Sequence, residues 1–144
     1  MNENSKLIEF MPEHLLLIDP VYGFQNNEKA LHAGGILKKG GPCTTLIYNR
    51  QVAVCGGLRI LWPGNAESWM YLSKTNNGPH VLKIIRDWLN ETIEKNKLDR
   101  VTAIIPVGDM WDHTERFLGF TQETILRKFG PNGIDKALYS RIRA

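Results

Sequence analysis

A polar turn between two apolar segments is the part of this sequence best suited to bind a charged ligand. The stretch 73–80 reads SKTNNGPH, with an apolar, aromatic run before it and a helix-like run after it. A helix that begins after a glycine-containing loop presents unpaired N–H groups and roughly half a positive charge at its N-terminus. Gly78 allows close backbone approach, Lys74 and Thr75 add donors, and Pro79 removes one. The pattern indicates an anion site, with phosphate as the candidate ligand.

The same residues also have an ordinary structural interpretation. Asn-Asn-Gly-Pro is common loop chemistry, and proline at the first helical position with glycine just before it is a frequent helix start. The turn by itself therefore leaves two alternatives open, a phosphate cradle and a simple connector. The neighbouring elements have to distinguish them.

The elements around this turn are the clearest in the chain. Apolar residues recur at helical spacing from Pro79 to about Asn96, which predicts a helix whose apolar face includes Trp88 as a core residue. The preceding run 68–73, SWMYLS, predicts a strand. After the helix, the continuous apolar run 100–107 predicts a strand covered on both faces. The turn is thus expected to join a strand to a helix inside the fold.

The N-terminal half predicts short helices followed by antiparallel strands. A strand is expected at 6–10, and Pro12 then begins a helix whose inner face holds Leu15, Leu16 and Ile18. A second short helix is expected from Asn27 to Ala33, ending at the glycine pair 34–35. Two β-rich runs between 43 and 61 predict a hairpin that turns near residues 49–50, followed by a turn over 62–67.

The C-terminal third completes an alternating order of elements. The segment 108–120 predicts a helix closed by Gly119, and the last residues predict two strands around a Gly-Pro-Asn-Gly turn at 130–133. The full order is β-α-α-β-β-β-α-β-α-β-β. This order predicts an α/β (α+β) fold with a mixed sheet.

Composition limits the classes of protein that this chain can belong to. Its 144 residues suit one domain, 1–144, which buries roughly 68% of its unfolded surface without metals or disulfides. The net charge of +3 is spread evenly, so no nucleic-acid partner is expected. Cys43 and Cys55 lack partners at ligand spacing, so no metal site is expected either. Without a signal-like start or a long apolar run, we expect a cytoplasmic protein with no membrane contact.

With these elements in place, the sequence resembles the GNAT acyltransferase superfamily over nearly its whole length. Three pieces carry the resemblance: the strand, loop and helix at 68–89; the strand and helix at 100–120, which end in Gly-Phe; and the terminal hairpin at 125–142. The resemblance implies a GNAT-like fold, a mixed, mostly antiparallel twisted sheet flanked by helices, with a central β-loop-α cofactor motif. It also implies acetyl-CoA as the cofactor, lying between two splayed parallel strands, 68–73 and 100–107.

The resemblance maps the pyrophosphate loop of the family onto residues 75–80. Only Gly78 stands where the family pattern requires it; Thr75 replaces a long polar residue and His80 a small one. Trp69 and Tyr71 share one face of the strand and line either the acyl or acceptor pocket or the core. The cofactor-binding residues that the resemblance implies are Tyr71, Leu72, Ser73, Lys74, Thr75, Asn76, Asn77, Gly78, Pro79 and His80.

The implied chemistry is attack of a neutral amine on a thioester, which needs a base, an oxyanion donor and a proton for the thiolate. By resemblance, Glu67 is the candidate base, although a solvated strand-end charge is an alternative interpretation. A backbone N–H near Leu72 is the candidate oxyanion donor. The position where many family members carry a proton-donating tyrosine, four residues before Gly119, holds Glu115. His113 is therefore the first candidate for the proton donor and Tyr139 the second.

The resulting prediction is an N-acetyltransferase that moves an acetyl group from acetyl-CoA directly to an amine, on either a small molecule or a protein. A homodimer is compatible with it. One alternative is a non-catalytic GNAT-fold protein such as a phage virion component, which the eroded loop and the missing tyrosine favour. Another is a toxin-like acetyltransferase acting on charged tRNA, which the even charge distribution disfavours.

Overall fold

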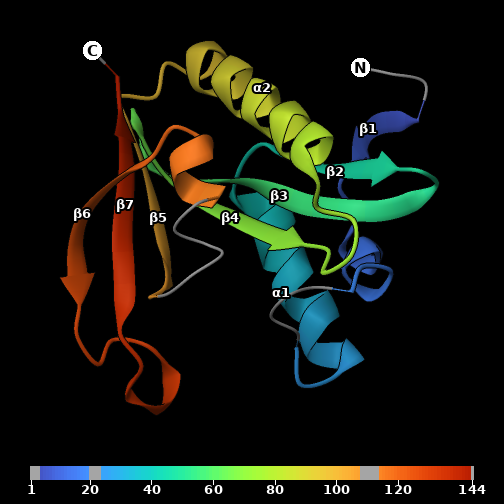
Figure 1. Cartoon of the computed structure of the whole chain (residues 1–144), viewed down its shortest axis with the longest axis horizontal. Coiled ribbons are helices and arrows are strands. Elements are labelled where there is room, and N and C mark those ends of the chain that lie inside the picture. Colours follow the sequence, from blue (N-terminus) through green and yellow to red (C-terminus); the bar gives the residue numbers. More distant parts are fainter. Residues whose placement is uncertain (1–3, 20–23, 108–113, 144) are drawn as a thin grey trace.

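The computed structural model describes residues 4–19, 24–107 and 114–143. It contains one mixed sheet with helices against both faces (Figure 1). The elements in chain order are β1 (Ser5–Glu9), η1 (Pro12–Leu16), α1 (Asn27–Gly40), β2 (Cys43–Tyr48), β3 (Gln51–Trp62), β4 (Asn65–Leu72), α2 (Pro79–Lys95), β5 (Arg100–Pro106), β6 (Thr121–Leu126), η2 (Pro131–Gly133) and β7 (Lys136–Ile142).

The sheet has the order β1-β2-β3-β4-β5-β7-β6. Among the described strands, every neighbouring pair is antiparallel except β4 and β5, which run parallel. A parallel pair needs a crossover connection, and α2 supplies it. The predicted mixed, mostly antiparallel sheet flanked by helices is therefore confirmed, including the two neighbouring parallel strands.

The main core lies between the sheet and α2. Its helical residues are the predicted apolar stripe, buried at Val81, Ile85, Leu89 and Ile93. Trp88 is half-buried and packs against this core, in agreement with its position on the apolar face. Burying four aliphatic side chains stabilises the fold by roughly 1.5–3 kcal/mol each before entropy is counted. This packing holds the N-terminus of α2 in a constant position relative to β4.

The opposite face of the sheet is covered by η1 and α1 (Figure 1). Here the predicted end of the second helix is wrong, because α1 continues through Gly34 and Gly35 to Gly40. A Cβ on Gly34 would lie 2.9 Å from the Cα of Pro12, so this glycine permits close packing of α1 against η1. Tertiary contact outweighs the cost of about 1 kcal/mol for a glycine inside a helix.

Three further expectations need correction. Leu15 and Ile18 are buried as predicted, but Leu16 is exposed, because Pro12–Leu16 is a short 3-10 helix with a different period. Strand β4 begins at Asn65, so the turn before it is shorter than predicted. Strand β5 is not covered on both faces: its burial alternates, and the segment from Ile104 onward is only half-buried.

The C-terminal elements follow the prediction within the described part of the chain. A helical turn at 114–117 ends before Gly119, whose φ of 94° is a conformation that favours glycine. The turn at 130–133 joins β6 to β7, with the N–H of Gly133 donating to the carbonyl of Gly130. No helix in the described residues has the length and apolarity that a membrane crossing requires.

Candidate functional site

The sheet opens between its two parallel strands. β4 and β5 pair only at Asn65 with Arg100, Ala66 with Val101 and Glu67 with Thr102. Beyond that point β4 continues along β3, and β5 continues along β7. The hydroxyl of Ser68 donates across the opening to the carbonyl of Thr102 at 3.4 Å. The two strands thus form a V with its apex at Glu67.

The splay leaves backbone groups of β4 facing the opening. Ser73 N–H donates to the carbonyl of Ala53 on β3 at 2.9 Å. Hydrogen-bonding direction alternates along an antiparallel ladder, so the N–H and C=O of Leu72 and Met70 point the other way, toward β5. Buried backbone groups are nearly always paired in proteins, and no described strand pairs with these. The opening therefore presents hydrogen-bonding groups to an extended ligand.

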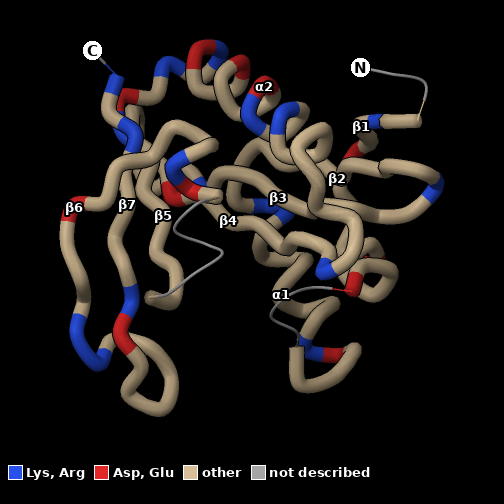
Figure 2. Tube along the Cα trace, in the orientation of Figure 1, with Lys and Arg blue, Asp and Glu red and all other residues tan. Residues whose placement is uncertain are grey.

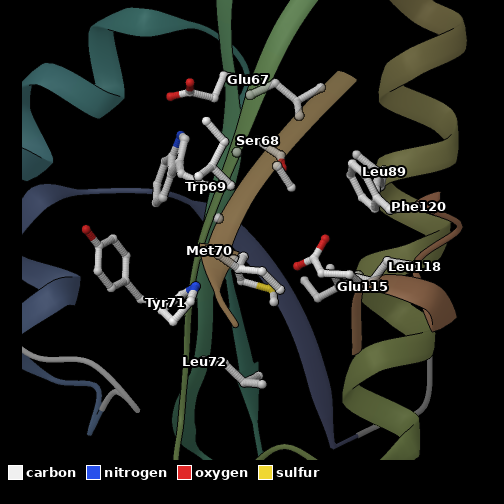
Figure 3. Close-up of a pocket in the computed structure, with 18 of the residues that line it drawn as sticks. Glu67, Ser68, Trp69, Met70, Tyr71, Leu72, Leu89, Glu115, Leu118 and Phe120 are labelled. Carbon is white, nitrogen blue, oxygen red and sulfur yellow. The ribbon is translucent and has the colours of Figure 1, made fainter. Parts of the chain in front are cut away.

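A cavity of about 700 Å³ occupies this opening. It reaches both faces of β4: Glu67, Trp69 and Tyr71 project from one side, and Met70 and Leu72 from the other, toward α2 (Figure 3). Its size is within the range typical of small-molecule sites. Because the cavity passes through the sheet, two ligands can reach its centre from opposite faces.

The loop after β4 is held by its own side chains. The hydroxyl of Ser73 accepts hydrogen bonds from the N–H groups of Thr75 and Asn76, at 3.2 and 3.1 Å. Asn76 donates to the carbonyl of Tyr48, and Asn77 donates to the carbonyl of Ser73, both at 2.9 Å. Two N–H groups that could face an anion are thus already engaged, and the shape of the loop is set before any ligand arrives.

The end of the loop is open. Gly78 is the N-cap of α2 and provides no side-chain cap, so the N–H groups of His80 and Val81 have no partner among the described residues, and the first paired N–H is that of Leu82, which donates to the carbonyl of Gly78 at 3.2 Å. A Cβ placed on Gly78 meets nothing within 4 Å. Lys74, four residues before Gly78, is exposed, and its ammonium lies 3.7 Å from the Asp19 carboxylate. The helix N-terminus is therefore accessible to an anion.

Glu67 lies at the apex of the V. It is half-buried, lines the cavity, and is the last residue of β4 paired with β5. Its side chain lies on the same side of β4 as Trp69 and Tyr71 (Figure 3). The predicted base is thus next to the point where the strands part.

That side of β4 is aromatic. The Trp69 ring lies 5.2 Å from Phe10 and 6.1 Å from Tyr71, measured between centroids, and Phe24 lies 5.1 Å from Tyr71. Trp69 and Tyr71 pack against the smaller core, which lies between the sheet and the helices η1 and α1, and they also line the cavity. These two side chains therefore belong to the core and also face the cavity. Burial raises the pKa of the Tyr71 hydroxyl, with the nearby Cys55 thiol contributing less.

Of the two predicted proton donors, the described structure includes only Tyr139. His113 lies outside the described residues. Tyr139 is 1% exposed in the core, and its hydroxyl donates to Gln122 at 3.3 Å. It is not among the residues that line the cavity.

The residue that the sequence reasoning passed over is Glu115. Its side chain lines the cavity on the α2 side of β4, and its carboxylate points toward Met70 (Figure 3). It is 5% exposed, and Oε2 has no hydrogen-bond partner among the described residues. Burial raises the pKa of this carboxyl to about 7. The sequence contained a signal for it, because Glu115 stands four residues before Gly119, where the resemblance places a proton-donating tyrosine. A glutamate was not the residue type expected there.

Among the described residues, the charged groups elsewhere do not gather into a region of one sign. Lys and Arg alternate with Asp and Glu over the described helices and strand ends (Figure 2). Several are paired with each other, such as Lys38 with Glu9 at 3.0 Å and Arg143 with Asp99 at 3.1 Å. The cavity walls are mainly apolar, so its few polar groups stand out.

Solved acetyltransferases share this fold. An acetyltransferase of the GNAT family from Bacillus anthracis aligns with a TM-score of 0.76 and 12% identity, over 99% of this chain and 96% of that one. The microcin C7 self-immunity acetyltransferase, solved with acetyl-CoA and AMP, gives 0.75 and 15%, over 99% and 94%. The spermidine N-acetyltransferase from Vibrio cholerae gives 0.72 and 12%, over 98% and 95%.

Neither a family model nor a curated protein sequence matches the chain. The likeness is therefore structural, and at these identities it shows the fold: the chain has the GNAT fold over nearly its full length. The predicted fold class is confirmed.

Proposed function

We propose that this protein is an N-acetyltransferase that transfers an acetyl group from acetyl-CoA to an amine. The observation that carries the proposal is the V between β4 and β5, whose unpaired backbone edges lead to an open helix N-terminus. A ligand whose amide-containing chain ends in phosphates would match both features, with the amides at the backbone edges and the phosphates at the helix N-terminus. The solved structures with this fold, one of them with acetyl-CoA bound, support the proposal.

The residues present fit such a ligand. The unpaired N–H and C=O groups of Met70 and Leu72 suit the amides of pantetheine, which can pair with them as a neighbouring strand would. The first turn of α2 suits the pyrophosphate, because its N–H groups and dipole favour an anion. The residues that would hold the ligand are Tyr71, Leu72, Ser73, Lys74, Thr75, Asn76, Asn77, Gly78, Pro79 and His80. Among these, Ser73 acts by shaping the loop.

The chemistry divides among groups at the apex and along β4. When bound, acetyl-CoA supplies a thioester, which a neutral amine can attack. Glu67 removes the proton of the amine, directly or through water, from its place at the apex. The N–H of Leu72 faces the opening and stabilises the charge that develops on the carbonyl oxygen. The aromatic side of β4 receives the acceptor, because Glu67 projects into the same side of the cavity.

The acceptor is an amine of a small molecule or of a protein. The spermidine enzyme shows that one acceptor class used on this fold is a polyamine, which is a property of that protein. In this chain the acceptor side combines the Glu67 carboxylate with the rings of Trp69 and Tyr71, which suits a cationic amine before it loses its proton. We expect the protein to act in the cytoplasm and to form one domain spanning 1–144.

Binding of acetyl-CoA is the direct test of this proposal. We expect millimolar acetyl-CoA to raise the melting temperature, because a ligand that binds only the folded state stabilises it by roughly 2.7 kcal/mol at 100 times its Kd. Differential scanning fluorimetry and calorimetry check this. The absence of both a thermal shift and a binding heat at saturating acetyl-CoA or CoA would refute the proposal. Binding without CoA release, with any amine of a broad panel, would instead identify a CoA-binding protein without catalysis.

Gly78 tests whether the turn binds the pyrophosphate. We expect Gly78→Val to weaken CoA binding about tenfold or more, because the side chain would occupy the space in front of the helix N-terminus. The fold should not change, since the Gly78 backbone has φ −69° and ψ 178° and its Cβ position is open. Titration calorimetry measures the affinity.

Gly35→Val is the matched control, because the Cβ position of Gly35 is also open and lies in α1, away from the loop. It should leave the CoA affinity unchanged. Equal CoA affinity in folded Gly78→Val and wild type would show that the turn is only a connector.

A further inference from the structure

The buried carboxyl of Glu115 has no role in the reaction as described so far. It lies in the helical turn at 114–117, on the α2 side of β4, and lines the same cavity as Glu67. Figure 3 shows its carboxylate directed at the opening between β4 and β5, with Leu118 and Phe120 beside it. Both apolar neighbours are 4% exposed, so the carboxyl has a dry wall on one side and the cavity on the other.

The isolation of this carboxyl has an energetic cost. Buried polar side chains are nearly always hydrogen-bonded, and an unpaired buried group costs about 1–3 kcal/mol. Oε2 of Glu115 has no partner among the described residues, although an apolar side chain such as methionine at this position would avoid the cost. A group that is costly in the free protein and faces a cavity is expected to find its partner in a ligand.

No described charge holds this carboxyl in its ionised form. Burial is the cause of its raised pKa, which is about 7, so near neutral pH a large fraction of Glu115 carries its proton. On the neighbouring elements, Arg86 of α2 lies over the Phe117 ring with its guanidinium carbon 4.6 Å from the centroid. Arg141 of β7 donates to Asn90 and to the carbonyl of Leu118.

Two further charged groups line the cavity. Lys136 is at the start of β7, and Glu67 projects from the opposite side of β4. Neither forms an ion pair with Glu115 in the described structure, and Glu115 Oε2 has no hydrogen-bond partner there. The carboxyl is therefore an acid whose proton is available to whatever enters the cavity from the α2 side.

We infer that the carboxylic acid of Glu115 is the proton donor to the thiolate released when the acetyl group is transferred. This inference rests on the proposed N-acetyltransferase function. Glu115 gives its O–H proton to sulfur as the carbon–sulfur bond breaks and the carbon–nitrogen bond forms. The proton lost by the amine leaves through Glu67 to water, and Glu115 regains a proton from solvent, so the overall products are the acetamide and the free thiol.

The position of the two carboxyls supports this division of work. Glu67 and Glu115 meet the cavity from opposite sides of β4. Glu67 is half-buried on the aromatic side, and Glu115 is fully buried on the α2 side. Two carboxyls in different environments can act as base and acid at one pH. Direct transfer needs both at once, because the amine loses a proton while the thiolate gains one.

Turnover as a function of pH tests the inference. Glu115→Gln keeps the shape and the neutral state of the carboxylic acid but cannot release a proton. We expect Glu115→Gln to lower turnover at pH 7 about tenfold. The effect is modest because the thiol has a pKa of about 8.5, so its thiolate can leave without a full proton transfer. The wild-type rate should also decline as Glu115 ionises above pH 7, a limb of the profile that the variant should lack. Glu91→Gln, the same change at an exposed residue of α2, should match wild type.

A second readout does not depend on activity. In protein labelled with ¹³C at the glutamate carboxyls, one resonance should titrate near pH 7, should be missing in Glu115→Gln and should move when CoA is added. Turnover in Glu115→Gln within twofold of wild type from pH 6 to 9, or a Glu115 resonance that CoA does not move, would overturn the inference and leave the proposed function intact. If wild type neither binds acetyl-CoA nor releases CoA, the proposed function fails and the inference fails with it.

Discussion

Glu67→Gln is expected to lower the turnover of acetyl transfer about 100-fold, with the affinity for acetyl-CoA unchanged. The expected size follows from the place of Glu67 at the apex of the V, where it is the last residue of β4 paired with β5 and lines the cavity on the same side as Trp69 and Tyr71. Glutamine has nearly the same shape as glutamate but accepts a proton poorly. The change therefore removes proton transfer and leaves the backbone edges that would hold the cofactor.

Steady-state release of CoA with a panel of amines measures this effect, and calorimetry measures the affinity for acetyl-CoA. Glu94→Gln is the matched control, because Glu94 is exposed on α2, and it should behave as wild type. Full turnover in Glu67→Gln would show that this carboxylate is only a solvated charge at the apex. The enzymatic function would then stand with a different base.

The stability of the protein is expected to fall as the pH rises from about 4.5 to about 7, because of Glu115. Burial raises the pKa of this carboxyl from 4.5 to about 7, so over this range the folded state binds a proton that the unfolded state has released. Stability decreases with pH wherever the folded state binds more protons than the unfolded state. Relative to a neutral side chain, Glu115 therefore costs the folded state about 2–3 kcal/mol more at pH 8 than at pH 5.

Urea unfolding at pH 5 and pH 8 measures this cost. The decrease in the free energy of unfolding between the two pH values should be larger in wild type than in Glu115→Gln, by about 2–3 kcal/mol. Other groups titrate in both proteins and cancel in the comparison. Glu91→Gln should keep the wild-type dependence. An equal decrease in wild type and Glu115→Gln would show that this carboxyl ionises in the folded protein as easily as in the unfolded chain.

The sequence by itself determined the order of the elements and the position of the turn that precedes α2. Apolar residues at helical spacing predict α2 because its stripe from Val81 to Ile93 must face the core. Gly78 and Pro79 mark the start of this helix, and the structure has it begin at Pro79. These signals are local, and a local pattern determines a local structure whenever tertiary packing reinforces it.

Other expectations failed where a contact distant in sequence decides the conformation. The glycine pair in α1 looks like a helix stop, but Gly34 is there because Pro12 packs against it. Likewise, the apolar run of β5 looks like a strand buried on both faces. The tertiary structure shows that β4 leaves it after Glu67, in agreement with the splayed strands that the family resemblance implies, so that the second half of β5 lines a cavity.

The tertiary structure alone also revealed the role open to Glu115. Its sequence neighbours indicate an ordinary residue of an amphipathic helix, and an isolated glutamate has a pKa of about 4.3. Burial against Leu118 and Phe120, at the edge of a cavity formed by strands distant in sequence, makes this carboxyl a weak acid near neutral pH. Residue type and spacing determined where the backbone of the site lies, whereas desolvation, which exists only in the folded chain, decided which side chain can carry the proton.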